Sequence, residues 1–247
     1  MVIVYIIFIS FLLSDSLIID NPLLSKKGLN FSVNMNGNLI PKEPKDLSPV
    51  EIDLIKSKAK DFVPNPVTEN DIIIMETNFG IMEFVFYNEE APNHSYNFKK
   101  LANSGYYDET IFHRIIPGFM AQGGDVLTRD SNKKNDGRGN PGWTVDQEFN
   151  NISHEKGVLS MARSQDVNSA GSQFFICFDN APHLNNKYTV FGKLISGYKV
   201  LDKIEKLKSE ANYIIDRSVS KVADAEKNNF LEFNYKNRKR YIKIPLN

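Results

Sequence analysis

Short runs of β-branched and aromatic residues recur from residue 71 onward, and no other feature of this 247-residue chain limits its fold as strongly. Ile72–Met75 and Ile81–Phe86 flank a turn at residues 78–80, which predicts a β-hairpin. Further strands are expected at residues 111–116, 119–122, 158–162, 173–178 and 188–194. Short strands at this spacing, separated by Gly and Asn, favour a mainly β protein built on an antiparallel barrel.

Two helices are expected between these strands. Pro92 stands where a helix would begin and Gly105 just past its end, the positions that these two residues favour. A second helix should start near Tyr198, because Leu201 and Ile204 continue an apolar pattern at three-residue steps.

Residues 17–70 are rich in Asn, Lys and Pro, which is typical of a linker. One short helix is predicted within it. Ser48 is suited to cap the helix, Pro49 to occupy its first position and Glu51 to complete a capping box, while Pro64 would end it. This helix would pack against the main domain or space the domain from a membrane.

The first thirteen residues are apolar except for Ser10, which fits the apolar core of a secretory signal. Ser14 and Ser16 form a small-any-small cleavage pattern, so the mature chain would begin at Leu17. Residues 1–16 are therefore predicted to be a signal peptide or an N-terminal anchor, and the protein to be exported to a periplasmic, secretory or extracellular location. No Lys or Arg precedes the apolar run, so a membrane-anchored or a cytoplasmic protein is the alternative. An uncleaved segment would associate weakly with a membrane.

Composition excludes several classes of function. Thirty basic and thirty acidic residues leave no net charge, so we expect no nucleic-acid partner. The four histidines lack metal-ligand spacing and Cys177 is the only cysteine, so no metal is expected. No other cofactor is expected either. We also expect the protein to be a monomer. Residues 137–142 match a dinucleotide-binding fingerprint by letter. Pro141 and Trp143 oppose the helix that such a site needs, so we interpret this stretch as a flexible loop.

The stretch from Phe112 to Asp125 carries the clearest functional signal. It reads FHRIIPGFMAQGGD and places one cation, Arg114, among apolar residues that include Phe119 and Met120, with an amide at Gln122. An apolar surface with a single guanidinium suits a neutral ligand that needs one directed hydrogen bond, such as a peptide bond.

Four motifs of this chain resemble the cyclophilins, in order and at the usual intervals. They are residues 112–125, GVLSMA at 157–162, GSQFFI at 171–176 and YTVFG at 188–192. Cyclophilins are peptidyl-prolyl cis-trans isomerases, or rotamases, that act in protein folding. The resemblance implies a closed eight-stranded antiparallel barrel capped by two helices. It is strongest over residues 71–207 and assigns residues 71–247 to the isomerase domain.

The same resemblance implies the roles of individual residues. Arg114 would be the catalytic arginine, with Gln122 beside it. The substrate, a proline-containing polypeptide, would be bound by Phe119, Met120, Ala162, Arg163, Gln173, Phe175, His183, Leu184 and Tyr188. His183 stands where many eukaryotic members have tryptophan, which puts tight cyclosporin binding in doubt, and Tyr188 stands where they have histidine. A catalytically weak proline-binding or chaperone-like module on the same fold is the alternative function.

The C-terminal region is longer than the family requires before its closing strand. Ile214, Ile215, Val219 and Val222 give a partial helical period, so we expect an inserted helix within residues 209–236. Residues 241–244 would then form the closing strand of the barrel.

Overall fold

The chain divides into two units, residues 1–44 with 244–247 and residues 45–243, which are described here separately. The structure is a computed structural model that describes residues 16–17, 31–34, 39–41, 46–77, 79–207, 217–223, 230–235 and 238–243. In the first unit, three strands form an antiparallel sheet in sequence order. They are β1 (Ser16–Leu17), β2 (Phe31–Asn34) and β3 (Leu39–Pro41).

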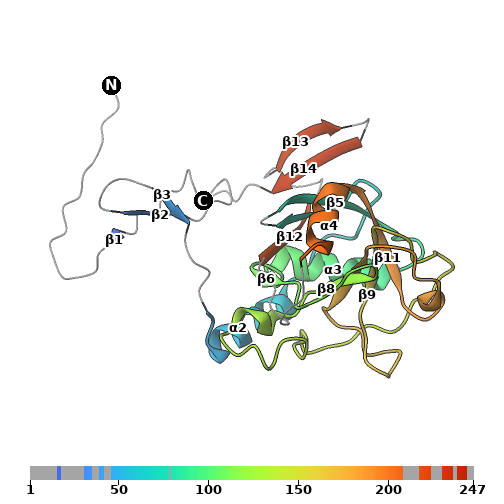
Figure 1. Cartoon of the computed structure of the whole chain (residues 1–247), viewed down its shortest axis with the longest axis horizontal. Helices are drawn as coiled ribbons and strands as arrows, with labels where there is room; N and C mark the ends of the chain where they lie inside the picture. The colour runs from blue at the N-terminus through green and yellow to red at the C-terminus, as the bar shows by residue number, and fades with distance from the viewer. Residues whose placement is uncertain are drawn as a thin grey trace. The chain divides into compact units, whose positions relative to one another are not determined.

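A curled antiparallel sheet of nine strands dominates the second unit (Figure 1). Its strands are β4 (Ile72–Thr77), β5 (Gly80–Phe86), β6 (Thr110–Ile111), β7 (Arg114–Ile116), β8 (Met120–Gly123), β9 (Val158–Met161), β10 (Phe174–Cys177), β11 (Val190–Ser196) and β12 (Arg217–Ala223). They lie in the order β6-β12-β4-β5-β11-β9-β10-β8-β7. The two end strands are separated in the chain by Phe112 and His113 alone. The predicted mainly β fold is confirmed, and the strand expected at residues 111–116 is interrupted at those two residues.

Three α-helices accompany this sheet in the described part of the chain. They are α2 (Pro49–Asp61), α3 (Pro92–Ser104) and α4 (Tyr198–Glu205), with short 3-10 helices at Val126–Arg129 and Pro182–Leu184. All three α-helices were expected near these positions. The predicted capping box of α2 is present, since Ser48 N donates to Glu51 Oε2 at 2.8 Å and Glu51 N to Ser48 Oγ at 3.4 Å. Gly105 ends α3 in the left-handed conformation, with φ of 83°.

The main core lies where α3 packs on the sheet. Phe98 of α3 has its ring centre 5.0 Å from that of Tyr107, 5.4 Å from Phe174 and 5.2 Å from Phe191. Ile52 and Ala59 of α2 are buried in the same cluster. Of the two roles expected for α2, packing against the main domain is therefore the one that the structure shows.

A second buried cluster lies apart from the main core. It consists of Met120, Val158, Phe175, Cys177, Ala181, Leu184 and Val190, and Phe119, Ala162 and Tyr188 pack against it while remaining partly exposed. Many of the residues predicted to bind substrate therefore share one apolar cluster of their own.

The C-terminal prediction is wrong in two respects. Val219 and Val222 lie in strand β12, where a helix was expected, and Ile214 and Ile215 fall outside the described residues. Strand β12 pairs with β4 and β6, whereas β14 (Arg238–Lys243) forms a hairpin with β13 (Phe230–Tyr235), so the expected closing strand at residues 241–244 does not join the large sheet in the described part. Pairing along β4 outweighed the weak helical period, because β-branched residues such as valine favour strands over helices.

The predicted signal segment falls almost wholly outside the described residues, which include only Ser16 of residues 1–16. None of the helices in the described part is long and apolar enough to span a bilayer.

Candidate active site

The hairpin formed by β7 and β8 places Arg114 directly opposite Gln122. Pro117 and Gly118 form its turn, in which Phe119 N donates to Ile116 O at 3.0 Å and Gly118 has φ of 74°. A proline followed by a residue with positive φ is the signature of a type II turn, which only glycine occupies without strain. The Arg114 guanidinium reaches across the hairpin, and its Nη1 lies 3.5 Å from Gln122 Oε1.

A line of amides continues from Gln122 to a neighbouring loop. Gln122 Nε2 donates to Gln173 Oε1 at 2.9 Å, and Gln173 Nε2 donates to the carbonyl oxygens of Gly137 and Gly139, each at 2.9 Å. Each amide is oriented by the next one along the line. The position of Gln122 beside Arg114 is therefore tied to the loop that carries Gly137 and Gly139.

A pocket of about 270 Å³ opens beside Arg114. It is lined by nine of the predicted site residues, Arg114, Phe119, Met120, Gln122, Ala162, Arg163, Phe175, Leu184 and Tyr188. The other two lie next to it. His183 is solvent-exposed and its ring centre lies 5.4 Å from that of Phe119, and Gln173 lines an adjacent cavity. The structure therefore brings all of the predicted residues to one region.

Buried aromatic contacts hold the wall of this pocket. Phe175 is only 5% exposed; its ring stacks on His154 at 5.9 Å and meets Tyr188 edge-on at 5.8 Å. Burial lowers the pKa of His154 despite its contact with Asn185, so the imidazole behind Phe175 is neutral at physiological pH. His154 was not among the predicted site residues, because nothing in its local sequence indicates the stack.

A second cavity, of about 280 Å³, adjoins the first and shares Gln122, Ala162 and Arg163 with it. Its further lining comes from residues 137–140, Ser164, Ser169 and residues 171–173. The loop at 137–142, interpreted from sequence as flexible, is held from beneath by Asp125. Oδ2 of this buried carboxylate accepts from Gly137 N at 2.6 Å and from Gly139 N at 3.0 Å. Side-chain contacts between distant segments of this kind leave no mark in a sequence pattern.

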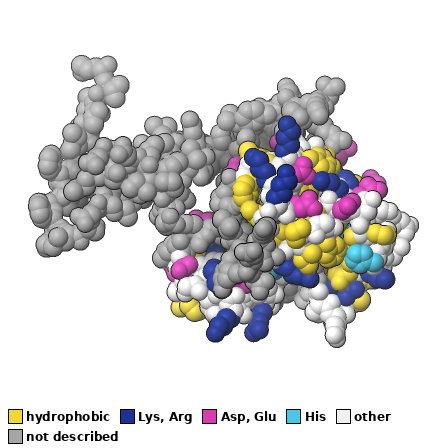
Figure 2. All heavy atoms as spheres, in the orientation of Figure 1, with side chains coloured by type: hydrophobic (Ala, Val, Ile, Leu, Met, Phe, Trp, Pro, Cys, Tyr) yellow, Lys and Arg dark blue, Asp and Glu magenta, His cyan; other side chains and the backbone are white. Residues whose placement is uncertain are grey.

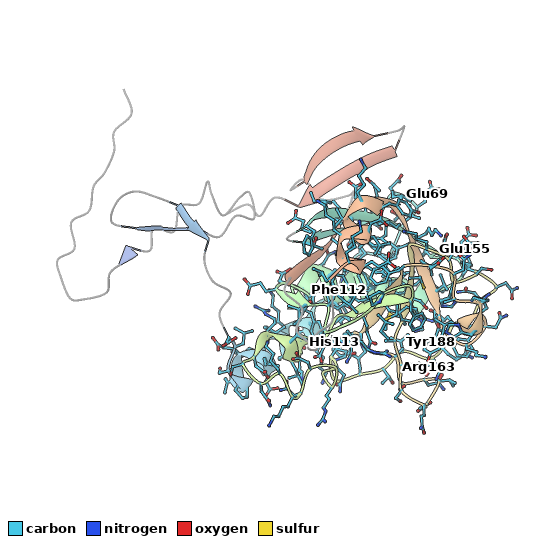
Figure 3. The ribbon with its side chains drawn as sticks, viewed as in Figure 1. Glu69, Phe112, His113, Glu155, Arg163 and Tyr188 are labelled. Carbon is cyan, nitrogen blue, oxygen red and sulfur yellow. The ribbon has the colours of Figure 1, made fainter. Side chains whose placement is uncertain are left out.

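Arg163 lines both cavities, and Figure 3 labels it near Tyr188. Its Nη2 and Nε donate to the carbonyl oxygen of Lys187 at 2.9 and 3.1 Å, and Nη1 donates to that of Ser164 at 2.9 Å. The guanidinium carbon is 4.6 Å from the centre of the Tyr188 ring, which is a cation–π distance. Arg163 therefore joins the loop after β9 to Tyr188 in the pocket wall.

Two other forms of catalysis, on a metal ion and on a thiol, find no support within the described residues. Within the described residues, no group of three His, Cys, Asp or Glu side chains could hold a metal ion. Burial raises the pKa of the Cys177 thiol to about 12, so it is not a nucleophile at neutral pH. What the pocket offers is the guanidinium groups of Arg114 and Arg163 and the amide of Gln122 beside apolar side chains.

Known proteins with similar sequences belong to one family. Residues 72–225 match the family model described as cyclophilin type peptidyl-prolyl cis-trans isomerase. The chain is 43% identical over 141 residues to peptidyl-prolyl cis-trans isomerase CYP18-1 of Arabidopsis thaliana, an alignment that covers 54% of this chain and 82% of that protein. It is 48% identical over 118 residues to peptidyl-prolyl cis-trans isomerase B of Bacillus subtilis, covering 47% of this chain and 77% of that protein.

A solved structure with a similar fold belongs to the same family. The crystal structure of a Cryptosporidium parvum cyclophilin type peptidyl-prolyl cis-trans isomerase, determined in the presence of the dipeptide Ala-Pro, superimposes with a TM-score of 0.55 at 34% identity. The match covers 61% of this chain and 96% of that one. The expected family and enzyme class are therefore confirmed, and the chain belongs to the cyclophilin-type peptidyl-prolyl cis-trans isomerases.

Proposed function

We propose that this protein accelerates the cis-trans isomerisation of Xaa-Pro bonds in polypeptides, with the proline ring in the pocket beside Arg114. The observation that carries the proposal is that Arg114 lines the same pocket as the apolar side chains of Phe119, Met120, Phe175 and Leu184. A related structure determined in the presence of Ala-Pro supports a proline-containing ligand.

The chemistry required follows from the peptide bond itself. Rotation costs ~18–20 kcal/mol because the nitrogen shares its lone pair with the carbonyl, and that lone pair becomes a hydrogen-bond acceptor once the bond twists. A donor such as Arg114 would then bind the twisted state more tightly than either planar state. No covalent intermediate or proton transfer is needed.

The hydrogen bond from Arg114 would supply only part of the rate acceleration. A hydrogen bond to a charged group contributes ~1.5–3 kcal/mol, or roughly ten- to a hundredfold in rate. The rest would come from Phe119, Met120, Phe175 and Leu184, which would grip the proline ring and exclude water while the carbonyl side of the bond turns.

The test is the rate of isomerisation of a short Xaa-Pro peptide, measured by NMR exchange with the full chain. Arg114→Ala should lower kcat/KM by about ten- to a hundredfold. Arg114→Lys should lower it less, because it keeps the charge but not the planar fork. Lys60→Ala, on the exposed side of α2, is the matched control and should have no effect. Peptide binding without acceleration by the wild type would instead indicate the proline-binding module.

Two finer features belong to this proposal. The nine-stranded sheet would close as an eight-stranded barrel if its end strands, Thr110–Ile111 and Arg114–Ile116, form one strand that is interrupted at residues 112 and 113. The protein would assist folding outside the cytoplasm, which the apolar first thirteen residues support. N-terminal sequencing and fractionation of the protein from its native host test the second point. Cleavage predicts Leu17 as the first residue, whereas a protein that retains Met1 and is found in the cytosol contradicts it.

A further inference from the structure

Positive charge is concentrated in the last two strands of the chain. Residues 230–243 contain a single acid, Glu232, and five basic residues, Lys236, Arg238, Lys239, Arg240 and Lys243. The whole chain has thirty residues of each sign, and both signs are interspersed on the described part of the face that Figure 2 shows. The segment lies beyond residues 72–225, which match the isomerase family, so the isomerase domain does not account for its charge.

These residues belong to a β-hairpin of their own. Strands β13 and β14 pair from Phe230 opposite Lys243 to Tyr235 opposite Arg238 (Figure 1). In the part of the chain that the structure describes, neither strand is hydrogen-bonded to the nine-stranded sheet. A two-stranded hairpin by itself is only marginally stable in water. It therefore gains stability from a surface that covers one of its faces.

The two faces of this hairpin differ in composition. Directly opposite residues of antiparallel strands share a face, and so do alternate residues along each strand. One face accordingly carries Leu231, Phe233, Tyr235, Arg238, Arg240 and Ile242. It combines aliphatic and aromatic residues with two arginines and has no acid. Glu232 belongs to the opposite face, together with Lys239 and Lys243.

We infer that this hairpin binds the surface of a bilayer that contains anionic phospholipids. The negative potential of such a surface attracts Arg and Lys, aromatic residues favour the level of the headgroups, and aliphatic residues enter the adjoining hydrocarbon. A nucleic acid would suit the cations and the aromatic rings, but it offers Leu231 and Ile242 no apolar partner. The inference goes beyond the proposed function and does not depend on the pocket beside Arg114. The hairpin thereby holds the isomerase domain at a membrane surface.

The experiment measures co-sedimentation of the full-length protein with vesicles of phosphatidylcholine alone and with vesicles that also contain phosphatidylglycerol. The readout is the ratio of the two partition coefficients. Residues 1–13 have no charged side chain, so their contribution to binding cancels in this ratio. Each Lys or Arg near an anionic surface strengthens binding about fivefold, so the ratio should exceed about ten. Raising NaCl from about 0.1 M to about 1 M shortens the Debye length from about 10 to about 3 Å and should bring the ratio toward one.

Variants locate the preference in the hairpin. The triple variant Arg238→Gln/Lys239→Gln/Arg240→Gln should lower the ratio at least about tenfold, whereas Arg238→Lys/Arg240→Lys should keep it, because charge is what the lipid surface attracts. The matched control Lys58→Gln/Lys60→Gln/Lys134→Gln removes the same charge from exposed positions elsewhere and should leave the ratio unchanged.

Isomerisation of a short Xaa-Pro peptide is measured in parallel with the same proteins. The hairpin variants should match the rate of the wild type, which shows that they are folded and tests the proposed function separately. A wild-type ratio of one, or a ratio that the triple variant retains, overturns the inference. Binding of a single-stranded oligonucleotide without any preference for anionic vesicles also overturns it and assigns the hairpin to nucleic acid.

Discussion

The side-chain amide of Gln122 donates a hydrogen bond of 2.9 Å to Oε1 of Gln173, and this bond joins the hairpin of Arg114 to the loop at residues 137–139. Without Gln173, the Gln122 amide would be free to rotate and two loop carbonyl oxygens would lose their donor. This hydrogen bond therefore keeps the side chains of Gln122 and Gln173 in fixed positions on the polar side of the site.

Gln173→Ala should consequently lower kcat/KM by about tenfold. The variant removes the hydrogen bonds of Gln173 with Gln122, Gly137 and Gly139, and one hydrogen bond contributes a net ~0.5–1.5 kcal/mol, of which only a part would affect the rate. The assay is NMR exchange on a neutral Xaa-Pro peptide. Gln165→Ala changes an exposed glutamine outside the lining of both cavities and is the matched control. Equal rates for the two variants would show that the amide line has no part in catalysis.

Glu205 at the end of α4 should act as a positioning residue for the turn that precedes Phe119. Its Oε1 accepts a hydrogen bond of 2.9 Å from Gly118 N. Glu205→Ala is expected to lower kcat/KM roughly two- to fivefold, consistent with the loss of about 0.5–1 kcal/mol. Glu205→Gln keeps an acceptor oxygen and should retain most of the activity. If Glu205→Gln is as impaired as Glu205→Ala, the charge and not the hydrogen bond is responsible.

A buried ion pair should dominate the stability of the region where the linker enters the sheet. Lys99 Nζ lies 2.9 Å from Asp71 Oδ2, and each side chain is 1% exposed. Lys99→Met should lower the free energy of unfolding by about 3–5 kcal/mol, because it leaves a buried carboxylate without its cation, and adding Asp71→Asn should recover part of the loss. Urea unfolding measures both. Lys156→Met breaks the exposed pair with Asp202 and should cost at most about 1 kcal/mol.

Stability should fall as the pH drops below about 6.5. Burial lowers the pKa of His94, His113 and His154 from the ordinary value of 6.5, so the unfolded chain binds more protons than the folded one in this range. Their contribution is complete above the unfolded pKa and is lost as the pH falls toward the folded values. The Tm should drop between pH 7 and 5, by about 2–4 °C for each kcal/mol lost.

One carboxyl group opposes this trend. Burial raises the pKa of Asp136 from 3.8 to about 6, so the folded state holds its proton more tightly and loses stability as the pH rises through this interval. Asp136→Asn should therefore steepen the rise of Tm with pH, and His154→Asn should flatten it. Gln165→Ala changes an exposed residue that does not titrate and should leave the slope unchanged.

Local signals in the sequence predicted local structure well. The capping box of α2 needs only Ser48 and Glu51, and the β4–β5 hairpin needs only two runs of strand-forming residues and a turn, so both predictions are confirmed. Strand β12 is different, because its pairing with β4 is decided by a segment about 140 residues away. The three-residue spacing of Val219 and Val222 fits a helix, whereas valine as a residue type favours a strand, and tertiary contacts settle which one forms.

The same difference between local and long-range signals applies to the residues of the candidate site. Arg114 and the apolar lining were predicted from motifs, and the structure brings them together around one pocket. The support behind them was not predicted, since Asp125 beneath the loop at 137–139 and His154 behind Phe175 act through contacts between segments distant in the chain. Such residues have no characteristic spacing, and only the fold reveals them.

The place of β12 between β6 and β4 has a consequence for biosynthesis. A chain that emerges from the ribosome presents β4 about 140 residues before its partner, which at ~5–20 residues per second is a delay of roughly 7–28 s. During that time the run Ile72-Ile73-Ile74 has an unpaired backbone edge of the kind that promotes aggregation. A protein that belongs to a family of folding catalysts would thus itself depend, while nascent, on chaperones that shield this edge.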